Sequence, residues 1–122
     1  MPITAKGHIL VIAPDIDLRR SLEFALEAEG YAVAARPQID VALLSAGARF
    51  DCTVLDHGAV VAPPSALIDF CVRAQPIVLL SNSAILWLSE WIAVTVEKPT
   101  PGGALSAAIQ SAMLSRSVAD VP

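Results

Sequence analysis

Five short apolar runs alternate with longer segments in which apolar residues recur every three or four positions. The runs cover residues 8–12, 31–34, 52–55, 77–80 and 91–96. Apolar runs of this length predict buried strands, and the less apolar second run is typical of an edge strand.

The segments between the runs predict helices. Apolar residues from Leu18 to Leu26, Ala25 included, are spaced as on one side of a helix. Asp15 or Asp17 would cap that helix, and Gly30 follows its end. Further helices are predicted over residues 37–47, 65–73 and 83–89 and from residue 104 onward, and no pattern is left from residue 118.

Strands that alternate with helices imply right-handed crossovers and a parallel sheet covered on both faces. Five such units within 122 residues indicate an α/β fold. We expect the flavodoxin-like doubly wound fold, a five-stranded parallel sheet of order 2-1-3-4-5 with about five helices. The whole chain, residues 1–122, is predicted to be one domain, with a core over about residues 7–116 and a flexible tail over 117–122.

Composition narrows the class of protein. Apolar residues make up 55% of the chain and charged residues 16%. This excess favours a sheet buried on both faces or a surface that pairs with another protein. The net charge of -4, without a basic cluster, argues against direct nucleic-acid binding. No apolar stretch has the roughly 20 residues that span a bilayer, and the start of the chain does not resemble a signal peptide, so we expect a cytoplasmic location without membrane contact.

Two cysteines lack the spacing of a zinc site. Cys52 falls in a predicted strand and Cys71 in a predicted helix. We expect both to be reduced thiols in the core, with a disulfide between them as the alternative.

Polar residues follow three of the predicted strands. Asp56, Ser81 and Lys98 each stand at or just after the carboxyl end of a strand. In an open α/β sheet these ends meet at one edge, where ligands bind. The first strand differs, because it ends in Ala13 and Pro14.

The sequence around these positions resembles the receiver domain of bacterial two-component response regulators. The likeness covers about residues 7–116 and is carried by residues 8–22, 26–31, 50–56, 79–81 and 96–99. The resemblance implies that Asp56 accepts a phosphoryl group from a histidine kinase. It further implies that Ser81 bonds a phosphoryl oxygen and that Lys98 pairs with the new negative charge. A lysine suits this chemistry because phosphoryl transfer depends on charge stabilisation.

The chain departs from the receiver pattern at the metal site. Receivers bind Mg²⁺ with an acidic pair after the first strand, the acceptor aspartate and a backbone carbonyl two residues later. Ala13 and Pro14 replace the acidic pair, which leaves Asp56 and the Gly58 carbonyl. Mg²⁺ prefers oxygen ligands in near-octahedral geometry, so we expect weak binding and no other cofactor. Asp15, one position beyond the pair, is predicted to cap the helix rather than to bind metal.

Other positions have a structural and a functional interpretation. Lys98 forms either part of a phosphate pocket or a static ion pair with Asp56. His57 is expected to be an exposed loop residue, since no second metal ligand has suitable spacing. Thr95 stands where receivers carry an aromatic switch residue, three before the lysine. Trp87 and Trp91 are assigned either to the core or to an interaction surface.

Three functions follow, in order of preference. The first is an atypical receiver, phosphorylation-independent or weakly phosphorylated, that binds a histidine kinase, another signalling protein or a second copy of itself, as a dimer. Its surface would comprise the fourth helix, the fifth strand and the fifth helix, with Trp87 and Trp91. The second is a working phosphoacceptor at Asp56 with weak Mg²⁺ binding, and the third is a small-ligand sensor that uses the same edge pocket. An enzyme is not expected, because no base and nucleophile pair appears outside the receiver set.

Overall fold

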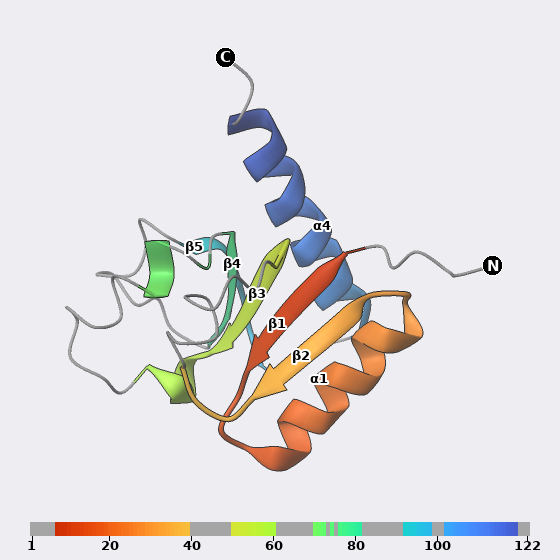
Figure 1. The fold of residues 1–122 in the computed structure, drawn as a ribbon, viewed down its shortest axis with the longest axis vertical. Coiled ribbons are helices and arrows are strands. Elements are labelled where there is room, and N and C mark those ends of the chain that lie inside the picture. Colours follow the sequence, from red (N-terminus) through yellow and green to blue (C-terminus); the bar gives the residue numbers. More distant parts are fainter. Residues whose placement is uncertain are drawn as a thin grey trace.

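The computed structural model describes residues 7–39, 50–60, 70–72, 74, 76–81, 92–98 and 102–119. The elements in chain order are β1 (His8–Ile12), α1 (Ile16–Ala28), β2 (Ala32–Arg36), β3 (Cys52–Asp56), the 3-10 turn η1 (His57–Ala59), β4 (Ile77–Leu80), β5 (Ile92–Val96) and α4 (Gly102–Ala119). Figure 1 shows β1, β2 and β3 side by side, with α1 and α4 beside them.

The five strands form one parallel sheet of order β2-β1-β3-β4-β5, as predicted. All carboxyl ends therefore lie at the same edge. The register places Asp56 of β3 opposite Leu80 of β4, and Leu80 opposite Val96 of β5. The residues that follow β4 and β5 are thus brought to the level of Asp56.

Several element boundaries differ from the prediction. β2 begins one residue later than expected and continues to Arg36, and β3 extends to Asp56 itself. α4 continues to Ala119, three residues into the tail predicted over 117–122. Residues 37–39 are not helical, although a helix was predicted to start there. The rest of that helix, the helix at 83–89 and most of the helix at 65–73 lie outside the described residues, while residues 70–72 are helical.

Helix α1 begins and ends as its sequence predicts. The Asp15 side chain caps the helix, and Gly30 follows it with a φ of 100°, a conformation that favours glycine. Leu22 and Leu26 are buried against the sheet. Ala25 is exposed, because the buried stripe is narrower than the spacing suggested.

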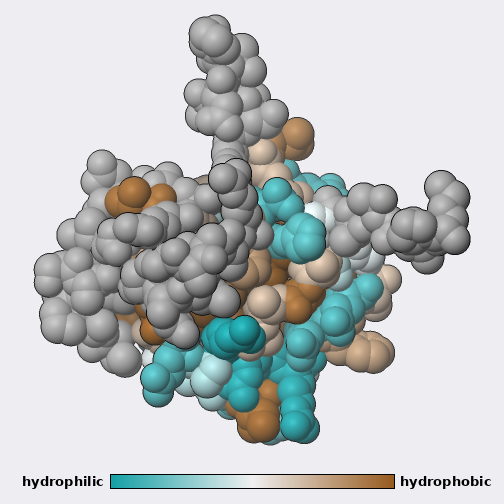
Figure 2. All heavy atoms as spheres, in the orientation of Figure 1, coloured by the Kyte–Doolittle hydropathy of each residue, from teal (hydrophilic) through white to brown (hydrophobic). Residues whose placement is uncertain are grey.

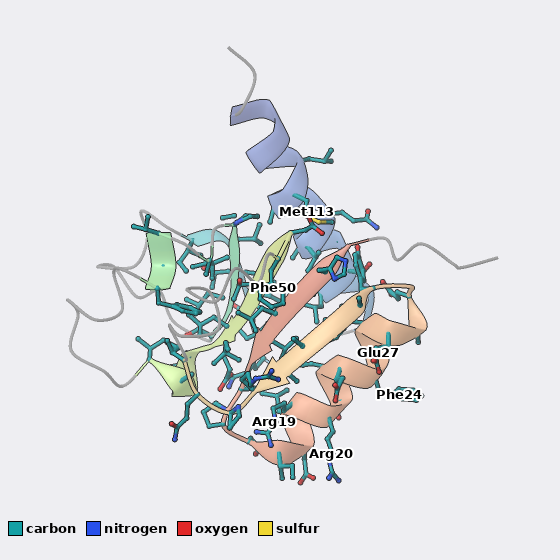
Figure 3. All side chains as sticks on the ribbon, viewed as in Figure 1. Arg19, Arg20, Phe24, Glu27, Phe50 and Met113 are labelled. Atoms are coloured by element: carbon teal, nitrogen blue, oxygen red, sulfur yellow. The ribbon has the colours of Figure 1, made fainter. Side chains whose placement is uncertain are left out.

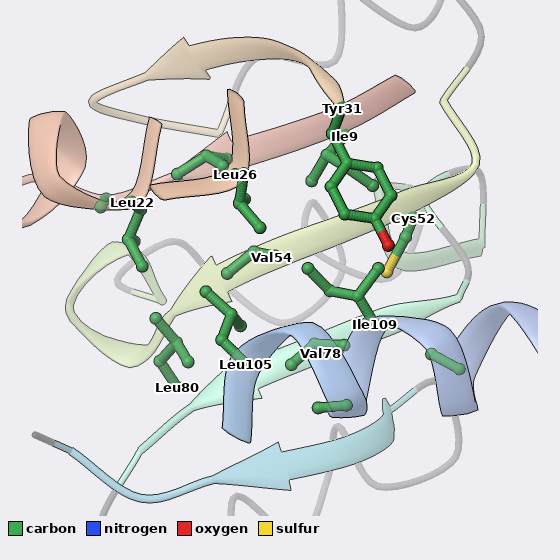
Figure 4. Packing of buried hydrophobic residues seen from close by; sticks show 14 residues of the cluster. Ile9, Leu22, Leu26, Tyr31, Cys52, Val54, Val78, Leu80, Leu105 and Ile109 are labelled. Carbon is green, nitrogen blue, oxygen red and sulfur yellow. The ribbon is translucent and has the colours of Figure 1, made fainter. Parts of the chain in front are cut away.

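The sheet separates two apolar clusters. The cluster under α1 and α4 is shown in Figure 4; its buried members are Ile9, Val11, Ala13, Leu22, Leu26, Tyr31, Cys52, Val54, Val78, Leu80, Leu105, Ala108, Ile109 and Ala112. The cluster on the other face contains Leu10, Ile12, Leu55, Ala59, Phe70, Cys71, Ala74, Ile77 and Leu79. Successive strand residues alternate between the two clusters, as the pleat requires.

The two cysteines are free and buried, one in each cluster. The prediction of reduced core thiols is confirmed, and the alternative disulfide is wrong because the sheet lies between them. Burial raises the pKa of the Cys52 thiol to about 12 and that of the Cys71 thiol to about 11. Both groups therefore stay protonated and unreactive at neutral pH.

Large hydrophobic side chains are exposed at a few described positions, namely Ile16, Phe24, Val72 and Leu114. Figure 2 shows that hydrophobic residues on the viewed face lie in separate patches among hydrophilic ones. Phe24 points away from α1 in Figure 3, and 76% of it is exposed. Among the described residues, no helix combines the length and the hydrophobicity needed to cross a membrane.

Candidate functional site

Asp56 is a nearly buried carboxylate at the carboxyl edge of the sheet. It is the last residue of β3 and the N-cap of η1, and only 4% of it is exposed. Its Oδ2 accepts a hydrogen bond of 3.1 Å from the backbone N–H of Gly58. A Cβ on Gly58 would lie 2.9 Å from that oxygen, so a larger residue there would have to displace the carboxylate.

Lys98 provides the countercharge. Its Nζ lies 2.6 Å from Asp56 Oδ1, with 29% of the Lys98 side chain and 6% of the Asp56 side chain exposed. The two residues come from the ends of β5 and β3, which are separated in the sheet by β4. The structure thus shows an ion pair between them, one of the two interpretations of Lys98, and both oxygens of the carboxylate accept a hydrogen bond from the protein.

Ser81 follows β4, between the strands that carry the ion pair. It is 1% exposed, and its backbone N–H donates a hydrogen bond of 3.0 Å to the Val96 carbonyl. The three residues predicted to meet at this edge are therefore on three neighbouring strand ends. Within this set, Lys98 contacts Asp56 directly.

The end of β1 contributes no carboxylate to this pocket. Ala13 is buried and Pro14 is exposed. The next residue, Asp15, is engaged elsewhere: its Oδ1 accepts hydrogen bonds from the backbone N–H groups of Asp17 at 2.8 Å and Leu18 at 3.1 Å. The prediction that Asp15 caps the helix is confirmed.

A basic side chain that the sequence did not single out lies at the same strand end. Arg19 Nη1 donates to the carbonyl of Ala13 at 2.9 Å and to that of Pro14 at 3.3 Å. Figure 3 shows Arg19 near the start of α1. Its position in the first turn of the predicted helix was the feature of the sequence that could have indicated this contact. These two backbone carbonyl oxygens at the end of β1 are therefore already hydrogen-bonded to a positively charged group.

The residues present do not fit Mg²⁺. Within the described part of the chain, no three His, Cys, Asp or Glu side chains lie close enough together to bind a metal ion. Near Asp56, the strand end carries an alanine and a proline, and the next carboxylate caps a helix. The side chains around Asp56 therefore supply too few oxygen ligands for a hard cation such as Mg²⁺.

The remaining candidates are placed as follows. His57 is exposed within η1, as predicted. Thr95 is an exposed residue of β5, and its register partner in β4 is Leu79. Trp87 and Trp91 lie outside the described residues, so their assignment to an interaction surface stays a prediction.

The sequence and the structure of this chain were compared with those of known proteins. No protein-family model and no curated protein matches the sequence. Among solved structures, full-length FixJ from B. japonicum is 30% identical with a TM-score of 0.75, and the match covers 95% of this chain and 62% of that one. A response regulator receiver domain protein from Clostridium thermocellum is 20% identical with a TM-score of 0.76, over 93% of this chain and 98% of that chain.

The chain has the receiver fold of response regulators. A response regulator from Burkholderia pseudomallei, solved with a phosphorylated aspartic acid, a calcium ion and citrate, also has this fold, with 22% identity and a TM-score of 0.70 over 95% of this chain and 74% of that one. This receiver fold spans less than two thirds of FixJ. In this chain the end of β1 carries Ala13 and Pro14, and Lys98 pairs with Asp56.

Proposed function

We propose that this chain is an atypical receiver that acts as a protein-interaction module without phosphorylation of Asp56. It is a signalling module rather than an enzyme. The observation that carries the proposal is the end of β1, where Ala13 and Pro14 place no carboxylate beside Asp56. The Asp56 oxygens instead accept hydrogen bonds from Lys98 and Gly58.

The missing acidic pair supports the same function. Attack of a carboxylate on a phosphoryl group brings two anions together, and their repulsion must be offset by cations. Lys98 offers one positive charge, which Asp56 already neutralises at 2.6 Å. With Ala13 and Pro14 at the end of β1, a divalent cation has no second carboxylate there.

The partner is a histidine kinase, another signalling protein or a second copy of this chain. The proposed surface is formed by β5, α4 and the segment that contains Trp87 and Trp91. Support within the described residues comes from Leu114 of α4, which is 66% exposed, and from the exposed Thr95 of β5. Aromatic residues are enriched at the centres of such interfaces.

Two measurements test this function. Intact mass after incubation with acetyl phosphate and Mg²⁺ should show no added phosphoryl group, for the wild type as for Asp56→Asn. Sedimentation velocity should show self-association that Asp56→Asn leaves unchanged and Trp91→Ala weakens. Phe24→Ala is the matched control, because Phe24 is an exposed aromatic on α1, a different helix. Stoichiometric phosphorylation that Asp56→Asn abolishes would overturn the proposal.

That outcome would establish the alternative function, a phosphoacceptor with weak Mg²⁺ binding. The observation that favours it is the contact between Asp56 and Lys98, since the same ammonium would pair with a phosphoryl oxygen after a small rotation. The two functions therefore differ in the mass measurement and not in the fold.

A further inference from the structure

The side chain of Pro14 lies against the loop that holds Asp56. A Cβ built on Gly58 would be 3.8 Å from Cγ and 3.9 Å from Cδ of Pro14, and 2.9 Å from Oδ2 of Asp56. The pyrrolidine ring and the Asp56 carboxylate thus both lie close to Gly58. In the sheet, β1 borders β3 on the side opposite β4 and β5, and Lys98 follows β5.

We propose that Pro14 keeps the Asp56 pocket free of divalent cations, with Lys98 as its resident cation. A proline ring offers no ligand atom, and next to Gly58 it takes up room that ligands and waters of a hydrated cation would need. Mg²⁺ and Mn²⁺ require oxygen ligands around the whole ion and retain several waters. An apolar ring on one side removes part of that shell.

The positive charge of Lys98 also disfavours binding of a divalent cation at Asp56. The Lys98 ammonium is 2.6 Å from Asp56 Oδ1, so a dication at the same carboxylate would lie close to a positive charge in a nearly buried site. On the β1 side, the Arg19 guanidinium already binds the carbonyls of Ala13 and Pro14. The Asp56 carboxylate therefore has the Lys98 ammonium beside it and the apolar Pro14 ring near Gly58.

The inference rests on the proposed function, since both describe a pocket that works without metal-assisted phosphorylation. It makes a separate claim about one residue: a carboxylate in place of the ring creates a metal site. Asp56 and the backbone of Gly58 are already positioned, so the new carboxylate needs to add only the missing ligand.

Mn²⁺ alone is the probe, with binding followed by electron paramagnetic resonance and by calorimetry. Wild type should show no saturable binding. Pro14→Asp should show saturable Mn²⁺ binding at least about tenfold above the detection limit at which wild type shows none, because affinity rises with the number of charged ligands. Pro14→Asn is the matched control, with the same shape and no charge, and should gain little. Asp56→Asn added to Pro14→Asp should remove the gained binding.

Pro14 is exposed, so these substitutions are expected to leave the fold intact, and circular dichroism checks this. Pro14→Glu provides a second carboxylate with a longer reach. Saturable Mn²⁺ binding by the wild type that Asp56→Asn abolishes would overturn the inference. So would two folded carboxylate variants that bind no better than Pro14→Asn. Neither result depends on phosphorylation or on a partner, so failure of the proposed function is seen separately in the mass and sedimentation measurements.

Discussion

Replacing Lys98 by methionine removes the ammonium from a carboxylate that has little access to water. The Asp56 side chain is 6% exposed and keeps one hydrogen bond, the 3.1 Å bond from Gly58. A hydrogen bond between charged groups contributes about 1.5–3 kcal/mol, and breaking a fully buried pair costs about 3–5 kcal/mol. Because 29% of Lys98 is exposed, water screens part of the interaction. We expect Lys98→Met to lower the free energy of unfolding by about 2 kcal/mol.

The partner substitution should cost less. In Asp56→Asn an amide oxygen remains to accept the Gly58 N–H, and the more exposed Lys98 is hydrated, so we expect a loss below about 1 kcal/mol. The double variant should lose less than the sum of the single losses, with a coupling energy of about 1–2 kcal/mol. Urea denaturation, fitted with one shared m-value, measures the free energy of unfolding of the wild type, the two single variants and the double variant. Equal midpoints for wild type and Lys98→Met, or additive losses in the double variant, would refute the assignment of a stabilising ion pair.

Three further outcomes are expected. Thr53→Val should raise the urea midpoint, by about 1 kcal/mol in stability, because the Thr53 hydroxyl is fully buried and, within the described part of the chain, has no hydrogen-bond partner. Asp15→Ala should lower stability by about 1 kcal/mol through the loss of two cap hydrogen bonds, which Asp15→Asn should largely retain. The raised thiol pKa values of Cys52 and Cys71 should make stability fall as pH rises from 9 toward 11–12, by about 1.4 kcal/mol per thiol at pH 10, measured by urea denaturation across that range.

The sign of the alkaline effect follows from proton binding. Above pH 9 the unfolded thiols lose their protons while the buried thiols keep theirs, so the native state binds more protons and stability falls with pH. The Cys52→Ala variant is the control, and should show a shallower decline. The cap assignment would be refuted by an Asp15→Ala variant as stable as wild type. The assignment of Thr53 as an unsatisfied buried hydroxyl would be refuted by a less stable Thr53→Val variant. The thiol effect would be refuted by a stability that does not change between pH 9 and pH 12.

The strands and the meeting of Asp56 with Lys98 could be predicted because both follow from one regularity. Short apolar runs alternate with helical segments, and parallel strands bring their carboxyl ends to one edge. Asp15 as a cap was also predictable, since its role depends on residues two and three positions away. Local pattern is sufficient where the interaction is local.

The contacts of Arg19 and Pro14 could not be predicted in the same way. Arg19 reaches back across the start of α1 to the carbonyls of Ala13 and Pro14, six and five residues before it. The position of the Pro14 ring depends on the path of the η1 turn beside Gly58. Both contacts depend on the path of the backbone between elements, which periodicity does not encode.

The contact between Lys98 and Asp56 joins two strands that are not neighbours, and so it crosses over the end of β4. At the end of the same strand β4, the backbone N–H of Ser81 donates a hydrogen bond to the Val96 carbonyl of β5. Detachment of the last residues of the outer strand would therefore break the ion pair and expose that amide in a single event. The hydrogen-exchange rate of the Ser81 backbone N–H thus reports how often the pocket opens, without any added label.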